Sequence, residues 1–393
     1  MKKLLKKNEN TFSDNNPLKF ELDNKIESMK EYLNQIINIL SRETIKPERL
    51  KQYNSLLAYS KIKINDIIYT IFGLYTPHSK TDFKSVTFLV TSFLNSFDNI
   101  STIYPMRSMG PILIENNLIP EIKERQNLIK KYFNYKQPLQ IDFSKLKENI
   151  PLTEEENKII KNEIIKDNNE PFYLISETIK YNKEEIQIVT DYCKKNNISI
   201  QALLYAVYLK ASLELFQNNI NEADIVNFQI IYNQRKVTVN DEKCIGLFAE
   251  GIYPYISIED ALNKSILDIS KILTNHIRKV NTLDNEEFKR YRIECYYIHK
   301  ELYTIEFSLS ATNMGKFKAL EDLSKNMKKK FVDFYFLNGL RFPISQDYKK
   351  IEIHMYSLFD QSCNISLSYP KYSISSIYAN KLLNKIKEIR LNI

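Results

Sequence analysis

Hydrophobic residues in the first third of the chain change from a helical spacing to a strand spacing and back. Between residues 26 and 40 they lie on one stripe of a helix, and between residues 67 and 75 they form a nearly continuous run rich in β-branched and aromatic side chains. Such a run is typical of a strand that is buried on both faces. Pro77 ends it, and apolar residues recur at helical spacing from residue 86 to residue 97. The expected unit is strand, short loop, amphipathic helix.

The second half of the chain mixes the two patterns without strict alternation. A strand is expected over residues 172–179, followed by two helices, and the second of these carries core-type residues from 200 to 215. Further strands are expected at residues 225–232, 304–312, 331–337, 351–356 and 365–369, before a closing helix at 375–389. This mixture indicates an α/β fold with mixed sheets, of the α+β kind.

Changes in composition divide the chain into segments. Residues 1–17 are polar and are expected to form an N-terminal tail. Residues 151–170 belong to a stretch that mixes Pro, Asn, Lys and Glu, and they are expected to be a linker. This leaves an N-terminal lobe of residues 18–150 and a C-terminal lobe of residues 171–393.

Composition and charge exclude several function classes. The 393 residues are 43% hydrophobic, which excludes a disordered chain, and the six glycines form neither GxGxxG nor GxxxxGK, which excludes a glycine-rich phosphate loop. The net charge of +8 is dispersed among acidic residues, whereas nucleic-acid-binding proteins concentrate theirs. We therefore expect no nucleic-acid partner, and a basic nucleic-acid-associated protein is the third-ranked interpretation.

The absence of certain motifs leads us to expect a cytoplasmic location and no metal site. The four cysteines lie far apart without a CxxC pair, so reduced, buried thiols and no metal site are expected. The basic N-terminus is not followed by an apolar signal region, which favours a cytoplasmic location. Lys210 and Glu214 interrupt the longest apolar helix candidate, so no membrane span is expected.

The loop after the strand at residues 67–75 carries the candidate chemistry. It contains His78 and Asp82 in an HxxxD arrangement directly before a helix. A histidine at the end of a strand is held in place, as a general base must be, and neutral imidazole accepts a proton near pH 7. The motif alone also arises by chance, and Asp82 is equally well placed to cap the helix.

These residues resemble the chloramphenicol-acetyltransferase-like acyltransferase superfamily. The superfamily includes alcohol acetyltransferases, polyketide-associated acyltransferases and the condensation domains of nonribosomal peptide synthetases, and its signature is HHxxxDG. His78 matches the second histidine, Asp82 matches the aspartate, and Ser85 stands where members often carry a serine. Pro77 replaces the first histidine and Phe83 replaces the glycine.

Further resemblances follow in the same order along the chain. Residues 197–204 are similar to the family's entrance to a central helix, and residues 226–235 are similar to a strand that ends in an arginine, here Arg235. Residues 245–248 match the segment that follows that strand. Residues 310–315, with Asn313 and Gly315, are similar to an S-x-N-x-G element, with one extra residue.

The resemblance implies a fold of two chloramphenicol-acetyltransferase-like lobes with a tunnel between them. It implies transfer of an acyl group from an acyl-CoA or carrier-protein phosphopantetheine thioester to a hydroxyl or amine, with His78 as general base and no permanently bound cofactor. Asp82 would pair with Arg235 and support the catalytic loop. The partners would be a small-molecule acyl acceptor and an acyl-carrier protein, and the chain would be a monomer.

Other residues keep alternative interpretations. The resemblance makes Ser85, Asn313 and Gly315 candidate channel residues, although Asn313 is equally well explained as a turn residue. His276, His299 and His354 are expected to be structural or surface residues. The run at residues 328–330 is interpreted as a solvated loop or as an attractor for an anionic phosphopantetheine or nucleotide. The alternative function is a non-catalytic member of the same fold that acts as an interaction module.

Overall fold

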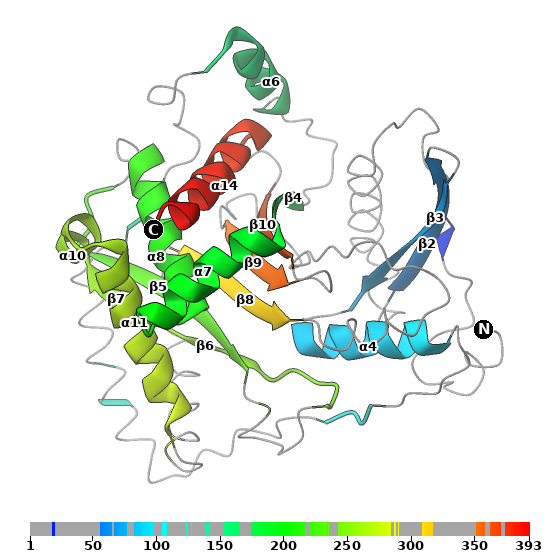
Figure 1. Ribbon diagram of the computed structural model, residues 1–393, viewed down its shortest axis with the longest axis horizontal. Coiled ribbons are helices and arrows are strands. Elements are labelled where there is room, and N and C mark those ends of the chain that lie inside the picture. Colours follow the sequence, from blue (N-terminus) through cyan, green and yellow to red (C-terminus); the bar gives the residue numbers. More distant parts are fainter. Residues whose placement is uncertain are drawn as a thin grey trace.

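Two β-sheets organise the molecule (Figure 1). The structure is a computed structural model, and it describes residues 18–19, 56–64, 67–76, 82–96, 104–107, 123–124, 127, 139–141, 152–164, 174–216, 221–233, 235, 243–283, 287, 290, 309–316, 351–357, 362–370 and 374–393. The polar tail 1–17, the helix expected at residues 26–40 and the strand expected at residues 331–337 lie outside this part of the chain.

The N-terminal sheet has three strands in the order β1-β2-β3: Leu18–Lys19, Leu56–Ile64 and Ile67–Tyr75. β2 and β3 form an antiparallel hairpin, and β1 pairs with β2 in parallel. β3 confirms the strand expected at residues 67–75, but the expected burial on both faces is wrong. Ile68 and Phe72 are exposed by 69% and 38%, since alternate residues of a strand point to opposite faces and one face of this hairpin is open to solvent at these two positions.

The helix expected after this strand is present as α4, Phe83–Asn95. It begins three residues before the predicted apolar stripe, because the expectation was based on hydrophobic spacing and not on the cap. Phe93 of α4 packs edge-on against Phe72 of β3, with ring centroids 5.1 Å apart. The helix therefore lies alongside the hairpin (Figure 1).

The C-terminal sheet has seven strands. Their order is β4-β10-β9-β8-β5-β6, and β7 pairs with β5 beside this path. The strands are β4 Leu174–Tyr181, β5 Ile225–Asn233, β6 Ala249–Ile252, β7 Tyr255–Ser257, β8 Leu309–Lys316, β9 Glu352–Ser357 and β10 Cys363–Pro370. β5, β8 and β9 run parallel to one another, whereas the other pairings are antiparallel, which confirms the expected mixed sheet.

Helices cover one face of this sheet. The described helices of this half are α7 Lys183–Lys195, α8 Ile200–Phe216, α10 Ile258–Asn263, α11 Ile266–Asn281 and α14 Ser376–Leu391. α8 confirms the predicted core helix: it is buried almost all round and packs against α11, α14 and β8. The closing helix is confirmed as α14. The short strands β6 and β7 and the helix α10 were not predicted, because each is too short to show a period.

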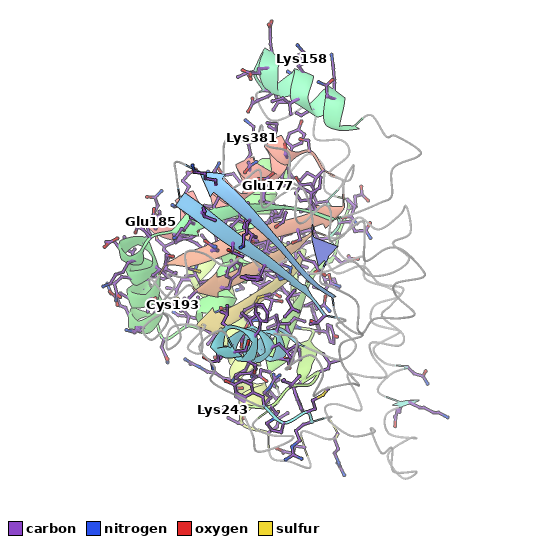
Figure 2. All side chains as sticks on the ribbon, turned by 90° about the vertical axis from the view of Figure 1, so that its right-hand side faces the viewer. Lys158, Glu177, Glu185, Cys193, Lys243 and Lys381 are labelled. Atoms are coloured by element: carbon purple, nitrogen blue, oxygen red, sulfur yellow. The ribbon has the colours of Figure 1, made fainter. Side chains whose placement is uncertain are left out.

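The range expected to be a linker contains a helix, α6, Glu154–Ile164. Thr153 caps it by accepting the Glu156 N–H at 3.1 Å, and Glu156 returns a bond to the Thr153 N–H at 2.8 Å. Ile160 is buried, and Lys381 of α14 forms an ion pair with Glu156 at 3.0 Å. Part of the expected linker is therefore docked on α14, at one end of the molecule (Figure 2).

A tyrosine of α8 reaches into the sheet. The Tyr205 hydroxyl accepts the Ala311 N–H of β8 at 2.9 Å and contacts the carbonyl oxygens of Gln229 and Ala311. A side chain of α8 thereby contacts backbone groups of both β5 and β8, at residues where the two strands are paired. Burial raises the pKa of Tyr205 far above its usual range, so the hydroxyl stays protonated.

Among the described residues no single helix has the length and apolar character to cross a membrane. α7 and α8 meet these criteria only as a pair, and the pair is bent by 106°.

Candidate functional site

Asp82 lies at the start of α4 and is its N-cap. Its backbone is extended, and its Oδ1 accepts the N–H of Ser85 at 2.9 Å. An aspartate here satisfies a helix N–H that has no partner within the helix and places a negative charge at the positive end of the helix dipole. The capping role expected as an alternative is therefore present.

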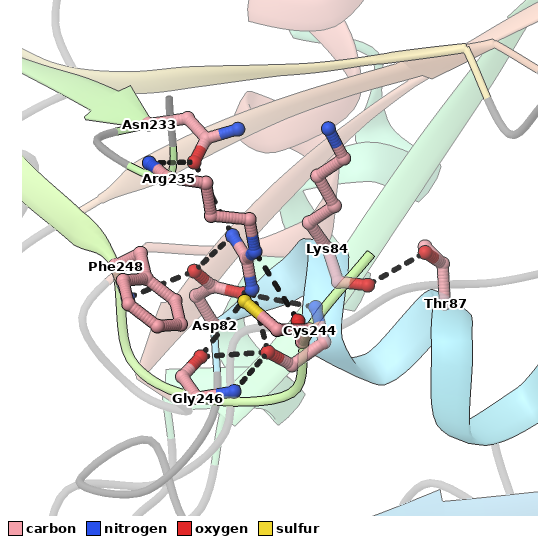
Figure 3. Close-up of polar contacts among 9 residues, drawn as sticks. Asp82, Lys84, Thr87, Asn233, Arg235, Cys244, Gly246 and Phe248 are labelled. Carbon is pink, nitrogen blue, oxygen red and sulfur yellow. Dashed lines mark hydrogen bonds and ion pairs between the residues drawn. The ribbon is translucent and has the colours of Figure 1, made fainter. Parts of the chain in front are cut away.

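Arg235 forms the expected ion pair with Asp82 (Figure 3). Its Nη1 donates to Oδ2 at 2.6 Å and its Nη2 donates to Oδ1 at 2.5 Å, across 153 residues of sequence. The side chains are 1% and 5% exposed. Two parallel charge-assisted bonds in a buried setting fix both position and orientation, so this pair joins the start of α4 rigidly to the segment that follows β5.

Ser85 and Gly246 complete the junction. The Ser85 hydroxyl accepts the N–H of Gly246 at 2.8 Å and the Nη2 of Arg235 at 2.7 Å, and it donates to the Gly246 carbonyl at 2.6 Å. The Asp82 N–H donates to the same carbonyl at 3.2 Å. All the hydrogen-bonding capacity of this hydroxyl is therefore used inside the junction.

The segment around Gly246 has no room for a side chain. A Cβ at Gly246 would lie 2.2 Å from the carbonyl oxygen of Arg107 and 2.6 Å from the Phe248 ring. Residues 105–107 approach this closely because Ile245 and Met106 form an isolated parallel bridge. Glycine is required here for close approach of two backbones, not for an unusual backbone angle.

The remaining polar groups of the ion pair also have partners. Arg235 Nε donates to the Cys244 carbonyl at 3.3 Å, Nη1 also donates to Asn233 Oδ1 at 3.2 Å, and the guanidinium lies 4.7 Å from the centre of the Phe248 ring. Asp82 Oδ2 accepts the Phe248 N–H at 3.0 Å. A buried pair is favourable only when its other hydrogen-bonding sites are filled, and the junction meets this condition.

The sequence reasoning matched residues 245–248 to the family but assigned them no role. The structure shows that Cys244, Gly246 and Phe248 contact the ion pair directly, all three through backbone groups. Backbone N–H and C=O groups are common to nearly all residue types, so the sequence does not reveal which of them will make such contacts. The only available signal was the glycine itself, one of six in the chain.

The other predicted site residues lie in different places. His78 lies outside the described residues. Asn313 and Gly315 belong to β8, where Asn313 Oδ1 accepts the Gly315 N–H at 3.0 Å and Gly315 has a positive φ of 74°. This contact is that of a turn residue, next to a register shift in β8. The channel role of Ser85, Asn313 and Gly315 stays a prediction.

Other residues with reactive side chains form no cluster in the described residues. Cys193, Cys244 and Cys363 are buried and form no disulfide within the described residues, as expected, and Cys295 lies outside the described part. Within that part no group of three or more His, Cys, Asp or Glu residues is arranged to hold a metal. His276 is on α11, and His354 is a buried residue of β9, whereas His299 is not described.

Comparison with known proteins shows similarity at the level of structure. No family model and no curated protein sequence matches the chain. The trichothecene 15-O-acetyltransferase TRI3 from Fusarium sporotrichioides matches with a TM-score of 0.60 at 11% identity, over 94% of this chain and 76% of that one.

Two nonribosomal peptide synthetase structures match similarly. The epimerization domain of tyrocidine synthetase B gives a TM-score of 0.57 at 12% identity, over 95% of this chain and 78% of that one. The four-domain synthetase AB3403 gives 0.58 at 13% identity, over 96% of this chain and 27% of that one. The chain therefore has the two-lobed, chloramphenicol-acetyltransferase-like fold that these condensation-type domains and this acetyltransferase share.

Proposed function

We propose that the chain is an acyltransferase that moves an acyl group from a thioester to a hydroxyl or amine. The observation that carries the proposal is the buried, bidentate Asp82–Arg235 pair at the start of α4. It fixes one end of the loop that contains His78. The strand β3, which ends at Tyr75, leads into the other end.

The covalent chain keeps His78 near this junction. His78 is four residues before Asp82, and an extended chain covers about 3.3–3.6 Å per residue, so the two Cα atoms are at most about 14 Å apart. A loop fixed at both ends loses less conformational entropy when it adopts one arrangement. In this proposal Asp82 and Arg235 are positioning residues, and His78 is the group that contacts the substrate.

The proposed reaction balances with one base. His78 takes the proton from the acceptor O–H or N–H while the acceptor oxygen or nitrogen attacks the thioester carbonyl. The tetrahedral intermediate collapses, the C–S bond breaks, and the proton passes to the leaving thiolate. The products are an ester or amide and a free thiol, without an acyl-enzyme intermediate or a bound cofactor.

The names of the similar structures support two kinds of donor. One similar protein is an acetyltransferase, and others are parts of nonribosomal peptide synthetases. We therefore include both an acyl-CoA and an acyl-carrier-protein thioester as donors, with a small-molecule acceptor.

Release of free thiol from a panel of acyl-CoA and acyl-carrier-protein thioesters, with simple alcohols and amines as acceptors, tests the proposal. His78→Ala should lower the transfer rate by about 10²- to 10⁴-fold, the contribution of a general base. His276→Ala, a substitution on helix α11 of the C-terminal half, is the matched control and should leave the rate within twofold. A His78→Ala rate within twofold of the parent protein would remove His78 from the mechanism.

A second function is favoured by two residues of the loop. Phe83 occupies the first position of α4, where the family signature has glycine, and Pro77 replaces the first histidine. These departures fit a non-catalytic member that uses the fold to bind a partner. Folded protein that releases no thiol from either kind of donor would support this function over acyl transfer.

A further inference from the structure

The helix α6 lies in the stretch of chain between the two sheets, and few described contacts hold it to the rest of the molecule. Among residues 154–162, whose side chains the structure describes, Ile160 alone is buried. Of the described elements, α6 packs mainly against α14. Isolated helices shorter than about 12–15 residues are marginal in water, and α6 has 11 residues. Its helical structure therefore depends on its docking.

Glu156 holds the first turn of α6 with both of its carboxylate oxygens. Its Oε2 accepts the Thr153 N–H at 2.8 Å, and its Oε1 forms the ion pair with Lys381 of α14 at 3.0 Å. The Glu156 and Lys381 side chains are 25% and 29% exposed. An ion pair that stays partly exposed is weak and is screened by salt. Among the described residues, α6 is therefore held mainly by one buried apolar side chain and one ion pair that salt weakens.

The helix α7 carries the same two contacts but has a stronger anchor. Glu185 Oε2 accepts the Asn182 N–H at 2.8 Å, and Glu185 Oε1 lies 2.8 Å from Lys387 Nζ of α14. In addition, Val189 and Cys193 of α7 are buried, and α7 packs against α8 and β4 as well as α14. The two helices thus share a cap and an ion pair to α14 and differ in the burial that anchors them.

We propose that α6 docks reversibly on α14 and detaches from it while the rest of the C-terminal half stays folded. Segments with few buried apolar contacts open locally at a lower free energy than the core does. The Asp82–Arg235 pair does not involve α6, and α6 lies at the end of the molecule away from α4 (Figures 1 and 2). Detachment of α6 therefore leaves this pair in place.

Detachment lengthens the connection between the two sheets. As a helix, the 11 residues of α6 span about 16 Å, whereas in an extended chain they span up to about 36–40 Å. Docking therefore withholds up to about 20 Å of reach. Because the Asp82–Arg235 pair still joins the start of α4 to the segment after β5, the two halves of the molecule gain freedom to turn about this pair without separating.

Hydrogen–deuterium exchange of the full chain, followed by mass spectrometry, tests the proposal. The amides of α6 should exchange at least tenfold faster than those of α7 and α14. Ile160→Ala removes the buried anchor, so it should speed exchange in α6 by at least a further tenfold. Exchange in α7 and α14 should stay within twofold.

A matched pair of substitutions tests the contribution of the ion pair. Glu156→Gln removes the charge and keeps a residue type that forms the same cap, so exchange in α6 should rise two- to fivefold. Glu185→Gln makes the same change in α7, and it should leave exchange in α7 within twofold. Sodium chloride at about 1 M should speed exchange in α6 of the parent protein by a similar factor, with no further effect in Glu156→Gln.

Three outcomes would overturn the proposal. Equal exchange rates in α6 and α14 of the parent protein would show that the two helices open together, and so would faster exchange in α14 of Ile160→Ala. Equal effects of Glu156→Gln in α6 and Glu185→Gln in α7 would show that the buried anchors make no difference. If circular dichroism shows that Ile160→Ala does not fold, the two glutamine variants and the salt dependence decide.

Transfer assays test whether docking matters for acyl transfer, and this part of the inference rests on the proposed function. A substrate that binds between the two lobes has to order them again when α6 is detached, and this entropy cost weakens binding. Ile160→Ala should therefore raise KM at least threefold and leave kcat within twofold. Detachment with an unchanged KM would retain the detachable helix and reject its role in transfer. A parent protein that transfers no acyl group would reject the proposed function and leave the exchange results unaffected.

Discussion

Two arginines in the described part of the chain are almost completely buried, and their surroundings are opposite. Arg235 is 1% exposed and Arg390 is 0% exposed. Arg235 meets a carboxylate through two bonds and also contacts backbone carbonyls and the Phe248 ring. Its charge is fully compensated.

Arg390 has no carboxylate partner among the described residues. Its Nη1 lies 3.7 Å from the Met355 sulfur, and its guanidinium lies 5.1 Å from the centre of the Tyr181 ring. Its Nε and Nη2 have no hydrogen-bond partner there. Its position in the last turn of α14 supplies some compensation from the helix dipole.

The difference shows that burial of an arginine does not by itself mark a functional site. Arg235 connects two segments that are 153 residues apart, and Asp82 caps the helix that follows the His78 loop. Among the described residues, Arg390 contacts Met355 and Tyr181, which belong to the core of its own half. The partner, not the burial, indicates which arginine has a positioning role.

Among variants that test the contrast between Arg235 and Arg390, Asp82→Asn should cause the largest loss of stability. It leaves Arg235 buried without a counter-charge, which typically lowers the free energy of unfolding by about 3–5 kcal/mol. Urea unfolding followed by circular dichroism measures it. Asp191→Asn, at an exposed position of α7, is the control and should change stability by less than about 0.5 kcal/mol.

The double variant Asp82→Asn with Arg235→Met separates the charge effect from the loss of the cap. It removes the uncompensated charge, so it should recover part of the stability that Asp82→Asn loses. Additive losses would show that the two residues act independently and that Asp82 matters only as a cap.

Arg390→Met should change the free energy of unfolding in the opposite direction from Asp82→Asn. Replacing a buried charge by an apolar side chain of similar length removes its desolvation penalty, and the free energy of unfolding should stay the same or rise by about 1–4 kcal/mol. The same urea titration measures it. A loss of more than about 2 kcal/mol would mean that Arg390 has a strong partner, and it would remove the contrast with Arg235.

Gly246→Ala should break the junction without touching a charge. The new Cβ would meet backbone at 2.2 Å, and such overpacking costs about 1–3 kcal/mol. Gly315→Ala is the comparison, since nothing lies within 4 Å of its Cβ and only its positive φ is strained. When Gly246→Ala is combined with Asp82→Asn, the losses in the free energy of unfolding should not be additive. When Gly315→Ala is combined with Asp82→Asn, the losses should be additive.

The smallest effect concerns groups near Arg390 and appears only at alkaline pH. Burial raises the pKa of Cys363 to about 11 and of Tyr181 to about 12, and the Arg390 charge opposes part of both shifts. The folded protein keeps these protons at a pH where the unfolded chain has lost them, so their contribution is complete below pH 9 and is lost as pH rises through 11 to 12. Urea midpoints between pH 8 and 11 should fall, and less steeply in Cys363→Ala.

The sequence predicted the elements that have a clear period. The strand β3, the helices α4, α8 and α14 and the strands β5, β9 and β10 lie close to their expected ranges. The pairing of Asp82 with Arg235 followed from a motif order resembling a known superfamily, not from periodicity. Besides the short elements β6, β7 and α10, the pattern missed α6, because its polar composition resembles that of a linker and its ion pair with α14 is a tertiary contact.

The contacts of the junction could not be predicted for a different reason. Cys244 and Phe248 take part through a carbonyl and an N–H that every residue type has. The neighbouring buried hydroxyls of Ser176 and Ser368 depend on strand register, which pairs these two residues across almost the whole length of the C-terminal half. Neither the backbone contacts of the junction nor the pairing of the two serines can be recognised from local composition.

The Tyr205 hydroxyl couples the position of α8 to the spacing between β5 and β8, because it contacts both strands. A hydrogen bond weakens steeply when its geometry is distorted, and one residue of helix rise is about 1.5 Å. α8 therefore cannot slide by one residue without releasing the Ala311 N–H. The rate of hydrogen–deuterium exchange at the Ala311 amide, in the sheet, therefore reports on movement of α8.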